Sequence, residues 1–251
     1  MSSSVNKDHR CIGLGLHHAP VHLSKAEFEA KINALVDTCL ALPVCQRNFL
    51  KFELMFPTDL LSNHIGGIGS IHPPDGVWVR YESPTHEHLA EVLTDPEFHQ
   101  LIADARDWGL DCDCSFSADV STKTDVASST PNNRAHGAWL IRIPSSMSGD
   151  DFQAKMVPFF DKIGALPVTQ KNVLKLTYWS QNTLAADAYR ALGYPTPEPV
   201  AVIMAEYETF DDMAELMQDE GIRKLFAEDN PFPELETWCF SMDVVTKVNK
   251  G

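Results

Sequence analysis

The chain contains 251 residues, of which 44% are hydrophobic and 22% are charged, so it carries enough apolar material to fold as a globular protein. Twenty lysine and arginine residues stand against 35 acidic residues, which gives a formal net charge of −15. This charge argues against nucleic acid or an anionic membrane as a partner, because both require a basic surface, and it leaves a small-molecule partner.

The N-terminal ten residues lack the apolar core of a signal peptide, and no apolar run approaches the ~20 residues of a membrane helix. The six cysteines are too sparse for a disulfide framework. The closest pair, Cys112 and Cys114, lacks the spacing of a zinc site. We therefore expect a cytoplasmic protein with reduced thiols, no membrane association and no bound metal.

The first predicted elements form a β-α-β-β-α-β order within residues 11–120. Ser24 and Glu27 have the spacing of a capping box at the start of the first helix, which ends near Pro43, and Thr85 is the expected cap of the second helix. Alternating or apolar runs predict the strands at residues 11–19, 48–56, 77–82 and 112–120. This order is the ferredoxin-like unit of the α+β class.

The second half of the chain repeats the first at an offset of 124 residues. Residues 41–51 return as residues 165–175 with eight of eleven positions identical, and the same register continues elsewhere without a gap. We therefore divide the chain into a first repeat, 11–120, a Ser-, Thr- and Asn-rich linker, 121–135, and a second repeat, 136–245. Ser148 and Thr209 are the predicted helix caps of the second repeat.

Each ferredoxin-like unit covers only one face of its sheet with helices, so the other face must also be buried. Two such units in one chain can bury both bare faces against each other. We expect the tandem repeats to form one α/β barrel within the chain, of the kind that two separate subunits form in a dimer. This architecture leaves both a monomer and a further homodimer open.

The topology, the helix capped by Ser24 and the Asp-Pro-Glu-Phe break at residues 95–98 resemble the dimeric α/β-barrel superfamily. Within it, the chain is most similar to the EthD-like branch in tandem form. The resemblance implies an enzyme that needs no bound cofactor and acts on an aromatic or polyketide-like substrate by proton transfer. Cyclisation, dehydration, decarboxylation and cofactor-free oxygenation are the implied reactions. A haem-binding barrel and a non-catalytic small-molecule-binding or stress protein remain the alternatives.

The first strand of each repeat indicates where a site could lie. Alternation places Gly13, Gly15 and His17 on one face, which we expect to look into the barrel. The counterparts of Gly15 and His17 in the second repeat are Trp139 and Ile141. The first repeat therefore leaves volume beside an imidazole where the second places an indole, and we predict a substrate cavity there. His17 is the predicted general acid or base, and both glycines and Trp139 are predicted to bind substrate.

The second strand of each repeat adds polar candidates. Glu53 faces the predicted barrel and differs from its counterpart Thr177, so we predict a carboxylate that orients the imidazole. Lys51 recurs as Lys175, which is typical of a rim charge or an ion pair. The predicted aromatic and cationic lining from these strands consists of Phe49, Lys51 and Trp179.

Residues 57–76 are long for a connection between two strands and contain three glycines. We interpret them as a cover over a barrel mouth, with His64 as a second catalytic candidate and His72 as a substrate-binding residue. The counterpart segment, 180–199, contains a predicted short helix that could bring Tyr189 over a ligand. His136, at the start of its strand, is interpreted as a solvated strand end.

Overall fold

The computed structural model describes residues 4–5, 10–65, 75–108, 110, 114–127, 134–235 and 237–250. The first half contains β1 (Ser4–Val5), β2 (Cys11–His18), α1 (Lys25–Ala41), α2 (Pro43–Asn48), β3 (Lys51–Thr58), β4 (Gly76–Ser83), α3 (His86–Leu93), α4 (Pro96–Asp104), a 3₁₀ turn (Arg106–Trp108) and β5 (Cys114–Asp125). The second half contains β6 (Ala135–Arg142), α5 (Gly149–Ala165), α6 (Pro167–Asn172), β7 (Val173–Asn182), α7 (Ala186–Ala191), β8 (Val200–Tyr207), α8 (Phe210–Gln218), α9 (Glu220–Glu228) and β9 (Thr237–Asn249).

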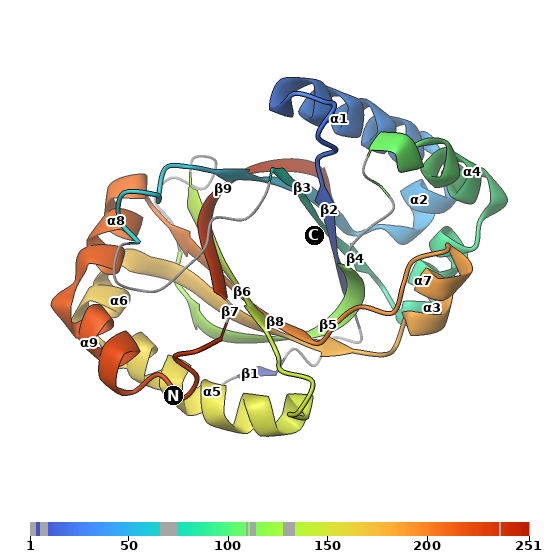
Figure 1. Ribbon diagram of the computed structural model, residues 1–251. Helices are drawn as coiled ribbons and strands as arrows, with labels where there is room; N and C mark the ends of the chain where they lie inside the picture. Colours follow the sequence, from blue (N-terminus) through green and yellow to red (C-terminus); the bar gives the residue numbers. More distant parts are fainter. Residues whose placement is uncertain are drawn as a thin grey trace.

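Eight of the strands close into one antiparallel barrel in the order β5-β2-β4-β3-β9-β6-β8-β7, and β7 pairs with β5 to complete the ring (Figure 1). The short β1 pairs with β5 outside the ring. Two seams join the halves, one between β3 and β9 and one between β5 and β7. This arrangement confirms the predicted α+β fold, in which two β-α-β-β-α-β halves form one barrel.

The local chemistry of the chain explains where its helices begin. Ser24 and Thr209 both form capping boxes with the third residue of their helices, whereas Thr85 precedes α3 without a hydrogen bond to the helix backbone. Pro43 and Pro96 begin α2 and α4, since the first helical position needs no backbone N–H. The strand predicted from residue 48 begins at Lys51, because α2 occupies the preceding residues.

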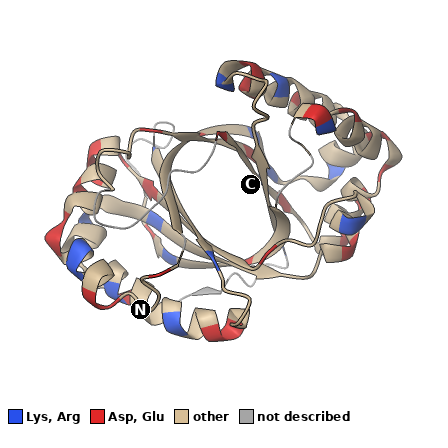
Figure 2. Cartoon of the chain, in the orientation of Figure 1, with Lys and Arg blue, Asp and Glu red and all other residues tan. Residues whose placement is uncertain are grey.

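Large apolar side chains fill the inside of the barrel. This inner core includes Leu14, Leu16, Trp78, Phe116, Trp179 and Phe240. The interior of an eight-stranded barrel is just wide enough for side chains to fill it. Two further cores lie between the outer sheet face and the helices, one in each half. The acidic and basic segments lie mostly on these outer helices (Figure 2).

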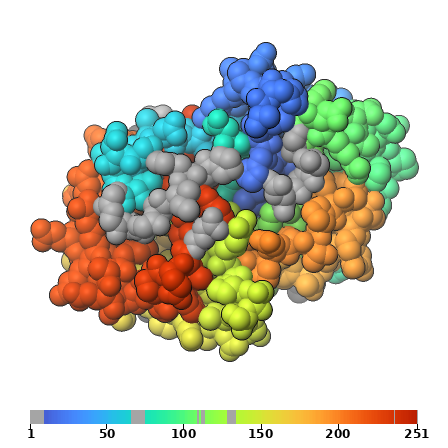
Figure 3. Space-filling model, in the orientation of Figure 1, coloured from blue at the N-terminus to red at the C-terminus, as the bar shows by residue number. Residues whose placement is uncertain are grey.

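The two connecting segments after β3 and β7 each cover the opposite half. Leu61 and Ile65 follow β3 but belong to the helix-side core of the second half. Ala188 and Tyr189, on α7, belong to that of the first half. Figure 3 shows the cyan segment beside the red helices and the orange segment beside the green ones. No helix in the described ranges is both long and apolar enough to cross a bilayer.

Candidate functional site

The face of β2 that carries Gly13, Gly15 and His17 looks towards the helices and not into the barrel. A Cβ atom at Gly13 would lie 2.1 Å from Cε2 of Tyr81, a residue of the helix-side core, whereas Leu14 belongs to the barrel core. The orientation predicted for this strand is therefore wrong. The barrel interior is a packed core that takes the leucines. Gly13 makes room for Tyr81 of the neighbouring strand, whereas Gly15 lies against Ser115 and His17.

The first strand of the second half, β6, shows the same reversal. Trp139 packs in the helix-side core of the second half, while Ala138 lies in the barrel core. His136 lines a cavity inside the barrel, so the interpretation as a solvated strand end is wrong. Burial lowers the pKa of His136 despite the nearby charge of Glu206. The wall of the barrel thus separates Trp139 from His136.

His17 is buried in the helix-side layer of the first half, with 6% of its surface exposed. Its ring lies edge-on to the ring of Tyr194, with centroids 6.2 Å apart. The described residues offer its Nδ1 atom no hydrogen-bond partner. Burial, and secondarily the charge of His18, lowers the pKa of His17 to about 4. The imidazole is therefore neutral at pH 7 and can accept a proton.

Three tyrosines continue from His17 through this layer. Tyr194 stacks on Tyr189 with ring centroids 6.5 Å apart, and the hydroxyl of Tyr189 hydrogen-bonds that of Tyr81. Tyr189 reaches the first half because α7 crosses over from the second. Burial, followed by the neighbouring Tyr189, raises the pKa of Tyr81 well above its usual value, so its phenol stays protonated. We refer to His17, Tyr81, Tyr189 and Tyr194 as the His–Tyr cluster.

The His–Tyr cluster has no polar equivalent at the repeat-related positions of the second half that the structure describes. Ile141 stands in place of His17, Ala205 in place of Tyr81, and Ile65 in place of Tyr189. All three belong to the apolar helix-side core of the second half. The asymmetry between the repeats that the sequence shows is real, but it lies outside the barrel wall.

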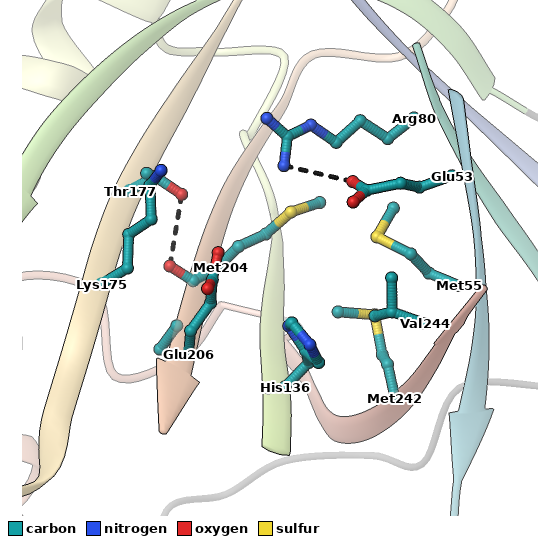
Figure 4. Close-up of a pocket in the computed structure, with 12 residues that line it drawn as sticks. Glu53, Met55, Arg80, His136, Lys175, Thr177, Met204, Glu206, Met242 and Val244 are labelled. Atoms are coloured by element: carbon teal, nitrogen blue, oxygen red, sulfur yellow. Dashed lines mark hydrogen bonds and ion pairs between the residues drawn. The ribbon is translucent and has the colours of Figure 1, made fainter. Parts of the chain in front are cut away.

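A separate cavity lies inside the barrel (Figure 4). Its volume is about 30 Å³, which suits about two water molecules. Charged and thioether side chains share its lining, which includes Glu53, Arg80, His136, Glu206, Met204 and Met242. Met55, Lys175 and Thr177 also line it, as the alternation of β3 and β7 predicts.

Glu53 is held by an ion-pair network in this cavity. Its carboxylate lies 2.9 Å from Lys51 Nζ and 3.3 Å from Arg80 Nη1, and Thr246 donates a hydrogen bond to it at 3.4 Å. Arg80 also pairs with Glu82 at 2.5 Å. The predicted role of Glu53 as a partner of His17 is wrong, because the two side chains lie on opposite faces of the barrel wall. Lys51 does form an ion pair, one of its two predicted uses.

The two predicted aromatic wall residues lie in different layers. Trp179 points into the barrel as expected, with the Arg80 guanidinium 5.2 Å from its ring centroid. Phe49 lies in the helix-side core of the first half, where its ring contacts Phe52 and Tyr81. The prediction for Phe49 is wrong because this residue ends α2, before the alternation of β3 begins.

His64 lies against the second half, away from His17. Its Nδ1 atom is 2.5 Å from Nε2 of Gln218, and its ring is 5.7 Å from that of Phe210. His72 lies outside the described residues, as do the three glycines of the predicted cover. Within the described ranges, no three His, Cys, Asp or Glu side chains are grouped so that they could hold a metal ion.

Sequence reasoning missed Arg80, Tyr81 and the inward position of His136. Trp78, Arg80 and Glu82 share one face of β4. Because two of these three side chains are charged, the alternation did not indicate which face of the strand is buried. The contact between Tyr81 and Tyr189 depends on the crossing of α7, and no local pattern encodes it. The concentration of tyrosines in the second half was the available signal.

No family model and no curated protein matches the chain. Solved structures match its fold over nearly its full length. An anthrone oxidase-like protein is 9% identical, with 100% of this chain and 98% of that chain covered and a TM-score of 0.62.

Two provisionally named monooxygenases also match. The protein from Fusobacterium nucleatum is 7% identical, with 98% of this chain and 96% of that chain covered and a TM-score of 0.58. The protein from Lactobacillus acidophilus is 5% identical, with 97% of each chain covered and a TM-score of 0.50. At these identities the likeness shows that this chain shares the barrel fold of the three proteins.

Proposed function

We propose that this chain is a cofactor-free enzyme of the EthD-like kind that removes a proton from an aromatic small molecule, with the His–Tyr cluster as its catalytic centre. The observation that carries the proposal is the buried, neutral His17, whose ring lies edge-on to that of Tyr194, in a layer that is apolar in the other repeat. The two halves thus share their packing, and only the first carries polar side chains at these positions.

We further propose oxygenation of an anthrone-type polyketide as the reaction. The names of two kinds of fold neighbour, monooxygenase and anthrone oxidase-like, support this choice. An anthrone carries an acidic CH₂ group between two aromatic rings and a carbonyl opposite it. The same proton transfer would serve a cyclase, a dehydratase or a decarboxylase.

The chemistry follows from the positions of the proton donors and acceptors. Nδ1 of His17 accepts a proton from the CH₂ group, and the charge moves to the carbonyl oxygen of the substrate. A tyrosine hydroxyl of the cluster then donates a hydrogen bond to that oxygen. The surrounding apolar core excludes water, which strengthens this bond. The developing negative charge also raises the basicity of an imidazole that burial has weakened.

The oxidant in this scheme is dioxygen. The substrate carbanion gives one electron to O₂, the two radicals combine, and a peroxide forms at the former CH₂ carbon. Loss of water from the peroxide leaves a second carbonyl, so that one anthrone and one O₂ yield one anthraquinone and one water. His17 returns its proton to the departing oxygen.

The test measures O₂ consumption and quinone absorbance with 1,8-dihydroxyanthrone as the probe. The wild-type protein is expected to accelerate quinone formation above the spontaneous rate, and His17→Ala to lower the acceleration about 100-fold or more. Tyr189→Phe should reduce kcat while leaving KM nearly unchanged. His86→Ala, which changes an exposed histidine paired with Glu87, is the control and should retain full activity.

Two results would overturn the proposal. One is a wild-type protein that leaves the spontaneous rate unchanged for anthrones and for other acidic phenols. The other is a His17→Ala variant that is folded by circular dichroism and turns over as fast as the wild type.

A further inference from the structure

Four adjacent strands of the barrel each place one soft metal-binding side chain on the inner face. These residues are Met55 on β3, Met242 on β9, His136 on β6 and Met204 on β8, and all four line the cavity of Figure 4. We refer to them as the thioether–imidazole quartet. The strands that carry it lie side by side in the order β3-β9-β6-β8.

The strand register brings the quartet together. His136 lies directly opposite Met242 in the β6–β9 pair. Met204 lies opposite Ala138 and is a diagonal neighbour of His136, whereas Met55 lies opposite Val244 and is a diagonal neighbour of Met242, displaced in the other direction along the strands. Directly opposed Cβ atoms are about 5 Å apart and diagonal ones about 7–8 Å, within reach of long side chains. Figure 4 shows the three sulfur atoms and the imidazole ring around one space.

The ligand set has a defined chemical preference. Thioethers and imidazole favour soft cations such as Cu(I), whereas Mg²⁺ and Ca²⁺ require oxygen ligands. His136 adds an imidazole nitrogen to the three thioether sulfurs of this lining. Glu206 lies opposite His136 in the β6–β8 pair, on the side away from Met242. A carboxylate that orients a histidine ligand is a common feature of metal sites.

The size of the cavity and the charges around it limit the site to one monovalent ion. The cavity of about 30 Å³ is too small for an organic substrate but accommodates a single ion. Its carboxylates are already balanced, since Glu53 pairs with Lys51 and Arg80, and Glu206 pairs with Arg134. A monovalent ion adds only one positive charge beside Arg80 and Lys175, which also line the cavity, so the uncharged sulfur ligands must supply most of the binding.

We propose that the thioether–imidazole quartet binds one soft monovalent cation, of which Cu(I) is the biological example, inside the barrel. This site is independent of the His–Tyr cluster, from which the barrel wall separates it. No electron transfer is required of it, because the cation enters and stays as a d¹⁰ ion.

The test titrates protein carrying ¹³C-methyl methionine with Ag(I), a redox-stable substitute for Cu(I), and follows each methyl signal by NMR. The chain has eight methionines. The signals of the three quartet methionines should move together and saturate with one ion. The six cysteine thiols also bind silver, so the titration continues beyond six equivalents, and the methyl signals report the thioethers separately.

Leucine variants give the assignment and the control. Met242→Leu and Met204→Leu keep the side-chain volume and should weaken silver binding at the quartet roughly tenfold or more. Met156→Leu, in the helix-side core of the second half, should leave it unchanged. The proposal is overturned if the three quartet signals stay in place throughout the titration, or if all eight methionine signals move alike.

Discussion

Neighbouring residues on one strand experience opposite environments because the barrel wall is one residue thick. On β2, Leu16 points into the barrel core, and His17, the next residue, points into the helix-side layer. On β3, Glu53 points inward to its cations, and Leu54 points to the helices. The surroundings of a strand residue therefore depend first on whether its side chain points into the barrel or towards the helices. The ring next to His17 is that of Tyr194, from the second half of the chain, and the carboxylate of Glu53, two strands away, lies on the other side of the wall.

The low pKa of His17 predicts a specific loss of stability in acid. The pKa is about 4 in the folded protein against 6.5 for an ordinary histidine, so the unfolded chain binds more protons between these values. The stability due to neutral His17 is complete above pH 6.5 and falls by about 3 kcal/mol as the pH drops to 4. His17→Asn should remove this slope in urea unfolding measured across that pH range. Equal slopes in both proteins would contradict the environment described.

The Glu53 network predicts a contrast between a buried and an exposed carboxylate. Glu53→Gln should lower the free energy of unfolding by about 2 kcal/mol, because Lys51 loses its partner in a buried site and Arg80 keeps only Glu82. Glu215→Gln removes an exposed pair with Lys171 and should cost less than about 1 kcal/mol. Chemical denaturation of both variants at neutral pH compares them, and equal losses would count against the network.

At the scale of elements, the helices are fixed by short-range signals. The cap side chains of α1 and α8 accept a hydrogen bond from the backbone N–H three residues later. Proline begins α2 and α4. The caps were readable in the sequence, so the starts of α1, α3, α5 and α8 were predicted correctly, whereas Pro43 was taken as the end of a helix and not as the start of α2. Strand alternation was readable as well. It placed the inward faces of β3 and β7 correctly and reversed those of β2 and β6.

The helix caps differ in a way that mutation can measure. Ser24→Ala and Thr209→Ala should each destabilise the protein by about 1 kcal/mol, since both remove a bond to an otherwise unpaired backbone N–H. Thr85→Ala is the matched control, because its hydroxyl bonds only to the side chains of Glu87 and His88. Thermal unfolding should rank Thr85→Ala well below the other two.

At the scale of the whole molecule, neither half is complete without the other. The outer strands of the first half pair with β9 and β7, and the first-half helix layer includes α7. Each isolated half would expose two strand edges and part of an apolar core, which is unfavourable in water.

This interdependence predicts how fragments behave. Residues 1–127 and 134–251, produced separately, should be poorly folded or self-associated. When they are mixed, they should give a 1:1 complex with the far-ultraviolet circular dichroism of the intact chain. Native mass spectrometry measures the stoichiometry. Two stable monomeric halves that ignore each other would show that the seams contribute little.

The limits of prediction from this sequence follow from the same geometry. The repeat identifies the barrel because an ungapped register over both halves leaves few other ways to bury two bare sheet faces. The position of the His–Tyr cluster was not predicted, because the direction in which the face with Gly13, Gly15 and His17 points depends on what fills the barrel. Placing Leu14 inward requires knowledge that the interior is packed. The contact between Tyr189 and Tyr81 depends on the crossing of α7 to the first half, and no sequence pattern near Tyr81 predicts that crossing.

The pairing of β3 with β9 also governs when the protein can fold during its synthesis. Lys51 lies opposite Asn249, so a strand that leaves the ribosome early must wait for the last strand of the barrel. Until β9 has been translated, one edge of the growing sheet stays open, and an open edge can pair with other chains. Barrel closure therefore cannot precede the translation of β9, and the edge of β3 stays open to other chains during this interval.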